Sequence, residues 1–158
     1  MKKIVVTLLL IISLSSILFY LYQWQSLKPF HCNAQVFAHL KIDEADAVEV
    51  NTHVDIIFRS PHDGIMKFSG SIKNKGNSYN LRRTVYFTVT PSELENVNEI
   101  VFTRTESHPL DNTPENLWHN RVLPQTPGIG FYSKIKELNN NAIIIKGFTN
   151  PLVVCIRQ

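Results

Sequence analysis

The stretch CNAQVFAHLKI, from Cys32 to Ile42, decides the fold, because apolar and polar residues alternate along it almost without exception. Its even-numbered residues are all apolar, and its odd-numbered residues are polar except for Phe37. A repeat of two residues places successive side chains on opposite faces, which is typical of a strand with one buried face. We therefore predict a half-buried β-strand over this stretch.

The same alternation resumes after the acidic turn at 43–47, from Val48 to Phe58, and ends at the turn sequence SPHDG at 60–64. A short turn between two such strands predicts an antiparallel hairpin. A third strand is expected over 65–73 and a fourth over 79–89, joined by the turn NKGN at 74–77. These four strands alternate in the way that a sheet with one buried face requires.

Beyond residue 90 the pattern predicts four more strands, near 99–106, 130–138, 142–149 and 152–157. Between them, residues 107–127 contain four prolines, and Thr113-Pro114-Glu115 is a helix-start signal with Thr113 as the N-cap. One short helix is expected from Pro114 to Val122. About eight short antiparallel strands indicate an all-β domain, and we predict an antiparallel barrel of about eight strands with one short helix, with a sandwich as the alternative.

The N-terminus carries a different signal, since Ile4 to Tyr22 is an almost unbroken apolar run. A helix of this length reaches about 29 Å, close to the thickness of a bilayer's hydrocarbon core. A cleaved signal peptide is the alternative, but its apolar core is usually about 7 to 15 residues and is followed by small residues. We predict a single-pass anchor over 1–24, a linker over 25–31 and an exported domain over 32–158.

The residues that flank this run set the orientation that we predict. By the positive-inside rule the N-terminus stays in the cytoplasm and the domain lies in the periplasm, outside a bacterial inner membrane. The membrane-interface residues are the basic pair at the start and the aromatic residues at the far end: Lys2, Lys3, Tyr20, Tyr22 and Trp24.

Charge and cysteine content narrow the function classes. Without Lys2 and Lys3 the chain has 14 basic and 13 acidic residues, so it lacks the basic surface that nucleic-acid binding requires. The two cysteines, Cys32 and Cys155, lie 123 positions apart at the two ends of the exported domain. In an oxidising compartment we predict a structural disulfide between them, because a redox pair would normally have a Cys-x-x-Cys spacing.

Arg83 is the one charged residue on the apolar face of the fourth strand. A buried arginine is costly unless it is paired. It therefore lies near the open end of the strand, belongs to a buried ion pair, or anchors a ligand. Leu117 and Trp118, in the expected helix, either pack into the core or form a lid or docking surface over the barrel.

No catalytic or metal-binding constellation is present in the sequence. Ser133 and Lys136 form a Ser-x-x-Lys pair, but in a strand these positions face opposite ways. The six histidines lack metal-ligand spacing. His39 and His53 either form a pH-sensitive pair or are ordinary surface residues. We therefore expect a protein that is not an enzyme and holds no metal or cofactor.

The chain resembles the FidL-like family of small bacterial membrane proteins. The resemblance is carried by the anchor, by Phe30-x-Cys32-x-Ala34, by the block GIMKFSGSIKNKGNSYNLRRTVYFTV at 64–89, and by the cysteine of the last strand. It implies a relation to ToxS and VtrC, which accompany membrane-spanning ToxR-like regulators and have a lipocalin-like barrel.

On that resemblance, the expected partner is the periplasmic domain of a ToxR-like regulator, and a bile-salt-like ligand pocket is a further expectation. Arg83, Leu117 and Trp118 are the candidate ligand or partner contacts. The alternative is a stand-alone barrel that senses or carries an amphipathic small molecule.

Overall fold

The computed structural model describes residues 2–24, 29–41, 47–94, 96–123, 126–139, 141–147 and 151–158. An N-terminal helix, α1 (Lys2–Trp24), precedes the strands β1 (Phe30–Lys41), β2 (Ala47–Ser60), β3 (Asp63–Asn74), β4 (Asn77–Pro91) and β5 (Asn98–Ser107). A helical segment, α2 (Glu115–Leu117) and η1 (Trp118–Val122), leads to β6 (Gly130–Asn139), β7 (Ala142–Lys146) and β8 (Pro151–Arg157). The predicted turn at 43–47 falls almost entirely outside the described residues, as do most of the linker and residues 148–149 of the seventh strand.

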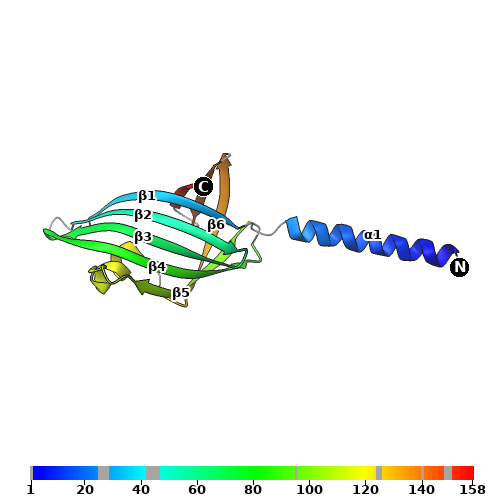
Figure 1. Cartoon of the computed structure of the whole chain (residues 1–158), viewed down its shortest axis with the longest axis horizontal. Coiled ribbons are helices and arrows are strands. Elements are labelled where there is room, and N and C mark those ends of the chain that lie inside the picture. Colours follow the sequence, from blue (N-terminus) through cyan, green and yellow to red (C-terminus); the bar gives the residue numbers. More distant parts are fainter. Residues whose placement is uncertain are drawn as a thin grey trace.

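The strands form a closed antiparallel barrel in which each strand pairs with the next and β8 returns to β1. This decides the choice between barrel and sandwich in favour of the barrel. Strands β1 to β5 form a long curved sheet, while β6, β7 and β8 are grouped at the end of the barrel from which α1 extends (Figure 1).

The core follows the predicted alternation. In β2 the inward residues Val48, Val54 and Phe58 are buried, and Phe37 of β1, at an outward position, is 69% exposed. Thr52 is the polar exception among the inward residues of β2, with 2% exposure. Burial of alternate residues is therefore what selects the register of these strands.

The structure explains why glycine is required at two positions, 76 and 70. In the predicted β3–β4 turn, Lys75 has a φ of 49° and Gly76 a φ of 78°, and a two-residue hairpin turn needs positive φ at both positions. Gly70 pairs with Thr52 across β2 and β3, and a Cβ there would lie 2.1 Å from the Asn51 carbonyl oxygen. That close backbone approach leaves no space for a side chain.

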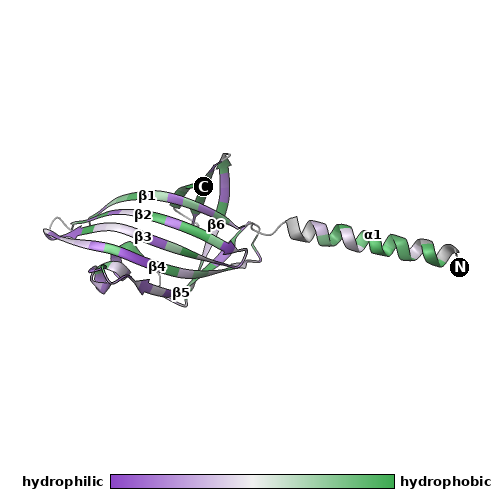
Figure 2. Cartoon of the chain, in the orientation of Figure 1, coloured by the Kyte–Doolittle hydropathy of each residue, from purple (hydrophilic) through white to green (hydrophobic). Residues whose placement is uncertain are grey.

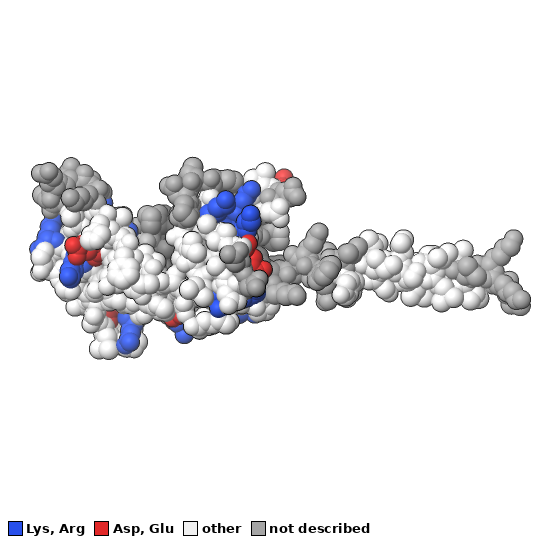
Figure 3. Space-filling view, turned by 90° about the horizontal axis from the view of Figure 1, so that it is seen from above, with Lys and Arg blue, Asp and Glu red and all other residues white. Residues whose placement is uncertain are grey.

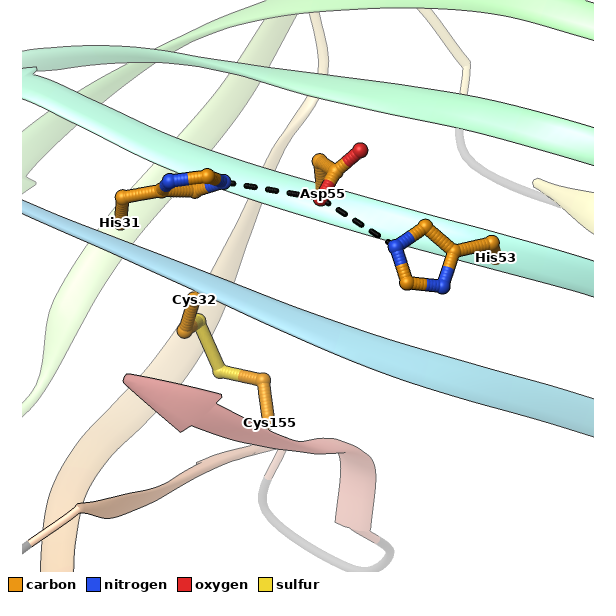
Figure 4. Close-up of a disulfide and its surroundings, with 5 residues drawn as sticks. All are labelled: His31, Cys32, His53, Asp55 and Cys155. Atoms are coloured by element: carbon orange, nitrogen blue, oxygen red, sulfur yellow. Dashed lines mark ion pairs between the residues drawn. A yellow bond between two sulfur atoms is a disulfide. The ribbon is translucent and has the colours of Figure 1, made fainter. Parts of the chain in front are cut away.

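The barrel closes at a short seam. Strands β1 and β8 pair at only two positions, Cys32 with Arg157 and Asn33 with Ile156. The predicted disulfide is present at this seam, with a Cα–Cα distance of 5.5 Å between Cys32 and Cys155 (Figure 4). Both cysteines are fully buried, so the bond holds the first and last strands together from inside.

The helix predicted near the N-terminus is present as α1, and Figure 2 shows its central part coloured as apolar. Its described apolar side chains are exposed; Leu9 and Ile11, for example, are 62% and 67% exposed. Among the described residues, no helix combines the length and the hydropathy that a membrane span requires. Of the predicted interface residues, Tyr20 is exposed, whereas the side chains of Lys2, Lys3, Tyr22 and Trp24 lie outside the described part.

The predicted second helix is present as α2 and η1, with Pro114 as its N-cap. The prediction that Thr113 caps this helix is wrong. Its hydroxyl donates a hydrogen bond to the carbonyl oxygen of Asn80 at 2.9 Å, and its side chain is buried against β4. The hydroxyl therefore ties the loop to the sheet instead of satisfying a helix N–H.

Candidate functional site

The barrel encloses an apolar cavity of about 250 Å³. Its wall is formed by inward residues of the long sheet, among them Val36, Ala38 and Leu40 of β1, and by Val153 of β8. The segment that ends η1 completes the wall with Arg121, Val122 and Leu123. The interior is therefore not filled by side chains, and a barrel of eight strands is wide enough to hold one small ligand.

Two lining residues are polar or charged, Thr52 and Arg121. The Thr52 hydroxyl donates to the His53 carbonyl oxygen at 3.2 Å, and a hydroxyl that donates one hydrogen bond still has lone pairs to accept another. Arg121 is half-buried. A cavity of this composition suits a molecule that is mostly apolar and carries one or two polar groups.

The cavity lies beside a gap in the wall. After Asn33, β1 has no strand partner on its β8 side among the described residues, and Leu152 of β8 lines the cavity while remaining 52% exposed. Val36, Ala38 and Leu40 are correspondingly only half-buried. Beyond the disulfide, the described residues of β1 and β8 are no longer paired, and this unpaired stretch of wall lies beside the cavity.

Arg83 lies at the centre of a buried polar cluster behind the helical segment. Its Nη2 donates to Asp111 Oδ1 at 3.1 Å and to the Thr113 carbonyl oxygen at 2.7 Å, and its Nη1 donates to Glu115 Oε2 at 2.9 Å. The Arg83 and Asp111 side chains are each 2% exposed. The guanidinium also lies 5.0 Å from the ring centroid of Trp118.

Burial alone would lower the pKa of Arg83, but the hydrogen bonds and charges of Asp111 and Glu115 outweigh it and raise that pKa. The guanidinium therefore remains charged. Of the three alternatives for Arg83, the structure selects the buried ion pair. The arginine fixes residues 111–118 against β4 and so positions η1, whose last turn lines the cavity.

Leu117 and Trp118 are both buried, which agrees with core packing. Trp118 meets Phe68 edge to face, with 5.2 Å between the ring centroids, and Phe68 lines the cavity. The residues of this helix that reach the cavity are Arg121 and Val122, which the sequence analysis did not select. The sequence signal for Val122 is its i to i+4 spacing from Trp118, which places Trp118 and Val122 on the same helix face.

The outer face of β1 and β2 carries a small cluster in which His31 and His53 flank Asp55 (Figure 4). Their Nε2 atoms lie 3.5 and 3.3 Å from Asp55 Oδ1. The alternative pairing of His39 with His53 is wrong, because the register places His53 opposite Gln35 and His39 opposite Glu49.

In the part of the chain that the structure describes, no group of three His, Cys, Asp or Glu side chains is arranged to hold a metal ion. Ser133 is buried and donates to the Lys146 carbonyl oxygen at 3.1 Å, whereas Lys136 is exposed. These two residues face opposite sides of β6, as their spacing predicts.

Comparison with known proteins identifies the family. No curated protein matches the chain. A family described as "FidL-like putative membrane protein" matches residues 70–155, just over half of the 158 residues. The match runs from Gly70 in β3 to Cys155 in β8 and includes Arg83 and the helical segment. The chain therefore belongs to the FidL-like family.

Proposed function

We propose that this protein is a non-enzymatic accessory protein of the bacterial inner membrane, whose periplasmic barrel binds a small amphipathic molecule and modulates a ToxR-like membrane-spanning regulator. The observation that carries the proposal is the apolar cavity of about 250 Å³ inside the barrel. An unfilled apolar interior costs stability, because its lining side chains lose packing contacts. A bound apolar group restores those contacts.

The chemistry of the lining indicates the ligand class. The apolar walls accept a hydrocarbon body, the Thr52 hydroxyl accepts one hydrogen bond, and Arg121 attracts an anionic head group. A bile-salt-like molecule or a fatty acid has this combination. The cavity lies within a single chain, which favours the alternative that the barrel senses or carries such a molecule by itself.

The membrane location is supported by the sequence and by the family. The run from Ile4 to Tyr22 is apolar, α1 exposes its described apolar side chains, and the family is described as one of membrane proteins. In Figure 3 the part of α1 whose side chains are described is white, which means that it has no Lys, Arg, Asp or Glu. A helix that is apolar all round is suited to lipid rather than to water. We propose that α1 anchors the barrel, with the N-terminus in the cytoplasm.

The proposed partner rests on the resemblance to ToxS and VtrC. A companion of this kind needs an anchor beside the regulator's own span and a folded periplasmic domain that can contact the regulator. Arg83 supports this role indirectly, because it fixes the helical segment beside the cavity and could couple ligand occupancy to the outer surface of that segment.

Ligand binding can be tested with a dansyl-labelled fatty acid and the full chain in amphipol, by following energy transfer from the two tryptophans, Trp24 and Trp118. Ala38→Phe places a ring in the cavity, while His39→Phe places the same ring on the outer face and serves as the matched control. We expect Ala38→Phe to weaken binding at least about tenfold and His39→Phe to leave it unchanged. Equal binding by all three proteins would exclude the cavity as the site.

The partner can be tested by co-purification from membranes, with the tagged full chain as bait and a ToxR-like regulator encoded beside it as the expected prey. The control bait is a tagged single-span protein with an unrelated periplasmic domain, which shows whether the regulator is recovered only because it lies in the same membrane fragments. We expect the regulator to be recovered with the chain and not with the control. If the regulator is recovered with neither protein, the result counts against the accessory role and favours the alternative of a stand-alone ligand-binding barrel.

A further inference from the structure

The outward side of β6, β7 and β8 is unusual for a barrel wall. Its described outward positions carry mainly apolar residues and lysines, and a carboxylate at its edge is that of Glu99 in β5, which pairs with Tyr132 and lies over Gly130. We call this surface the β6–β8 outer face; its residues are Tyr132, Lys134, Lys136, Leu138, Ala142, Ile144, Lys146, Val154 and Ile156. Along β8, Val154 and Ile156 are 51% and 62% exposed.

The strand register joins these side chains into one continuous patch. Ile144 pairs with Val154, and Ala142 pairs with Ile156, so the apolar residues of β7 and β8 are neighbours. Lys136 lies opposite Ile144, and Lys134 lies opposite Lys146, so the lysines border the apolar residues. Contiguous exposed apolar surface with a polar border is typical of an interaction site.

The outer face of β1 and β2 provides a contrast within the same barrel. Its outward residues include Asn33, Gln35, Asn51 and Asp55, which is the polar pattern expected of a strand whose outer side faces water. β8, in contrast, is apolar on both sides, because Val153 and Cys155 face inward and Val154 and Ile156 face outward. Packing of the barrel core does not require that outer apolar column.

The position of the patch in the chain indicates what covers it. Ile156 pairs with Asn33, and Asn33 follows Trp24, the last residue of α1, by only nine residues. Nine residues reach about 30 Å even when fully extended. Figure 1 shows β6 at the end of the barrel from which α1 extends, and Figure 3 shows basic side chains gathered at that end, bordered by a few acidic ones.

We propose that the β6–β8 outer face rests on the surface of the bilayer that holds α1, with its apolar residues at the headgroup level and its lysines on anionic lipid phosphates. Apolar residues bordered by three lysines, with Glu99 at one edge, complement an anionic membrane surface. This inference rests on the proposed anchoring by α1. The contact orients the barrel, so that the gap between β1 and β8 has a fixed position relative to the membrane.

The test uses the full chain in vesicles of phosphatidylcholine, with or without phosphatidylglycerol, whose acyl chains carry bromine, a quencher of tryptophan fluorescence. Ile156→Trp places a reporter in the patch, and Phe37→Trp places one on the polar outer face of β1. Both sites are largely exposed, so neither change alters the core. The wild-type chain gives the background from Trp24 and Trp118.

We expect the added tryptophan of Ile156→Trp to be quenched at least about twofold more than that of Phe37→Trp, and more strongly with phosphatidylglycerol present. Replacing Lys134, Lys136 and Lys146 by glutamine should remove the dependence on phosphatidylglycerol. Val154→Trp, with its own reporter on the same face, should reproduce the result of Ile156→Trp.

Equal quenching of the patch and control reporters, while the wild-type background from Trp24 is quenched, would overturn the inference and leave the anchor intact. A background that bromine does not quench would instead overturn the anchor itself, and with it this inference. If the patch reporters change their emission only when a ToxR-like regulator is added, and bromine does not quench them, the face binds protein and the membrane contact is wrong.

Discussion

At the scale of single residues, the buried Arg83 cluster shows how a costly charge is retained. Asp111 accepts hydrogen bonds from Arg83 and also from the backbone N–H groups of Arg82 and Thr113, at 2.7 and 3.0 Å. A buried ion pair contributes net stability only when such additional hydrogen bonds satisfy its remaining groups. The cluster therefore stabilises one position of the loop rather than adding a large net energy.

Removing one partner should be far more damaging than removing both charges. We expect Arg83→Met to lower the free energy of unfolding by about 3–5 kcal/mol, because it leaves the Asp111 carboxylate buried and unpaired. Arg83→Met with Asp111→Asn should recover much of this loss, since an amide oxygen still accepts from the backbone. Urea unfolding followed by tryptophan fluorescence measures the stability of both variants. A double variant no more stable than the single one would contradict this account.

Asp63 provides a pH-dependent prediction. A hydrogen bond with Ser60 and the nearby charge of Arg59 hold the pKa of Asp63 below its ordinary value of 3.8. A carboxyl whose pKa is lowered on folding stabilises the folded state above that ordinary value and loses this contribution as the pH falls. Ser60→Ala should raise the pKa, as followed by NMR titration of the Asp63 carboxyl carbon, and Arg59→Gln should raise it less. A Ser60→Ala titration identical to that of the wild type would exclude the hydrogen bond as the cause.

At the scale of elements, the β2–β3 pairing depends on Gly70. Its neighbour across the sheet is Thr52, and the Asn51 carbonyl oxygen fills the space where a Cβ would lie. Close approach of two backbones is one of the positions where glycine is needed in a strand. The same pairing also forms one wall of the cavity, through Thr52 and Phe68.

We therefore expect Gly70→Ala to destabilise the barrel by about 1–3 kcal/mol, because the strands must move apart to admit the methyl group. Ser71→Ala, at the adjacent position, serves as the control for a change in strand composition and should have a much smaller effect. Thermal unfolding followed by circular dichroism gives the comparison. Equal melting temperatures for the two variants would show that β3 shifts without cost.

At the scale of the whole molecule, the closure depends on a seam with only two paired positions and one disulfide. The Cys32–Cys155 bond closes a loop with a sequence separation of 123, and in the chain-entropy model such a bond contributes about 4–5 kcal/mol. For a single domain that is a large fraction of the total stability. The disulfide therefore holds together the part of the barrel where the described strand pairing is shortest.

We expect Cys32→Ser with Cys155→Ser to lower the free energy of unfolding by up to about 4–5 kcal/mol, measured by denaturant unfolding of the oxidised and substituted chains. Hydrogen exchange should become faster first in β8 and at the start of β1, since the remaining pairing there is short. Unchanged protection in both strands would show that the seam is stable without the bond.

Much of this fold follows from the sequence alone. A period of two in apolar residues is a local property of a strand, so it predicted β1 to β4 and the outward position of Phe37. The NKGN turn and the disulfide between Cys32 and Cys155 could also be predicted, because turn geometry and disulfide chemistry depend on residue type. The apolar run at the N-terminus predicted the helix that is present as α1.

Other features were decided only by the tertiary structure, because they depend on which distant residues become neighbours. The sequence favoured a closed barrel without excluding a sandwich, and it left open whether Arg83 binds a ligand or an acidic side chain and whether the interior is filled. Asp111 and Arg83 are 28 residues apart, and the cavity is bounded by residues from β1 to β8. Local periodicity fixes the direction of each side chain, but only the closed barrel determines what each side chain meets.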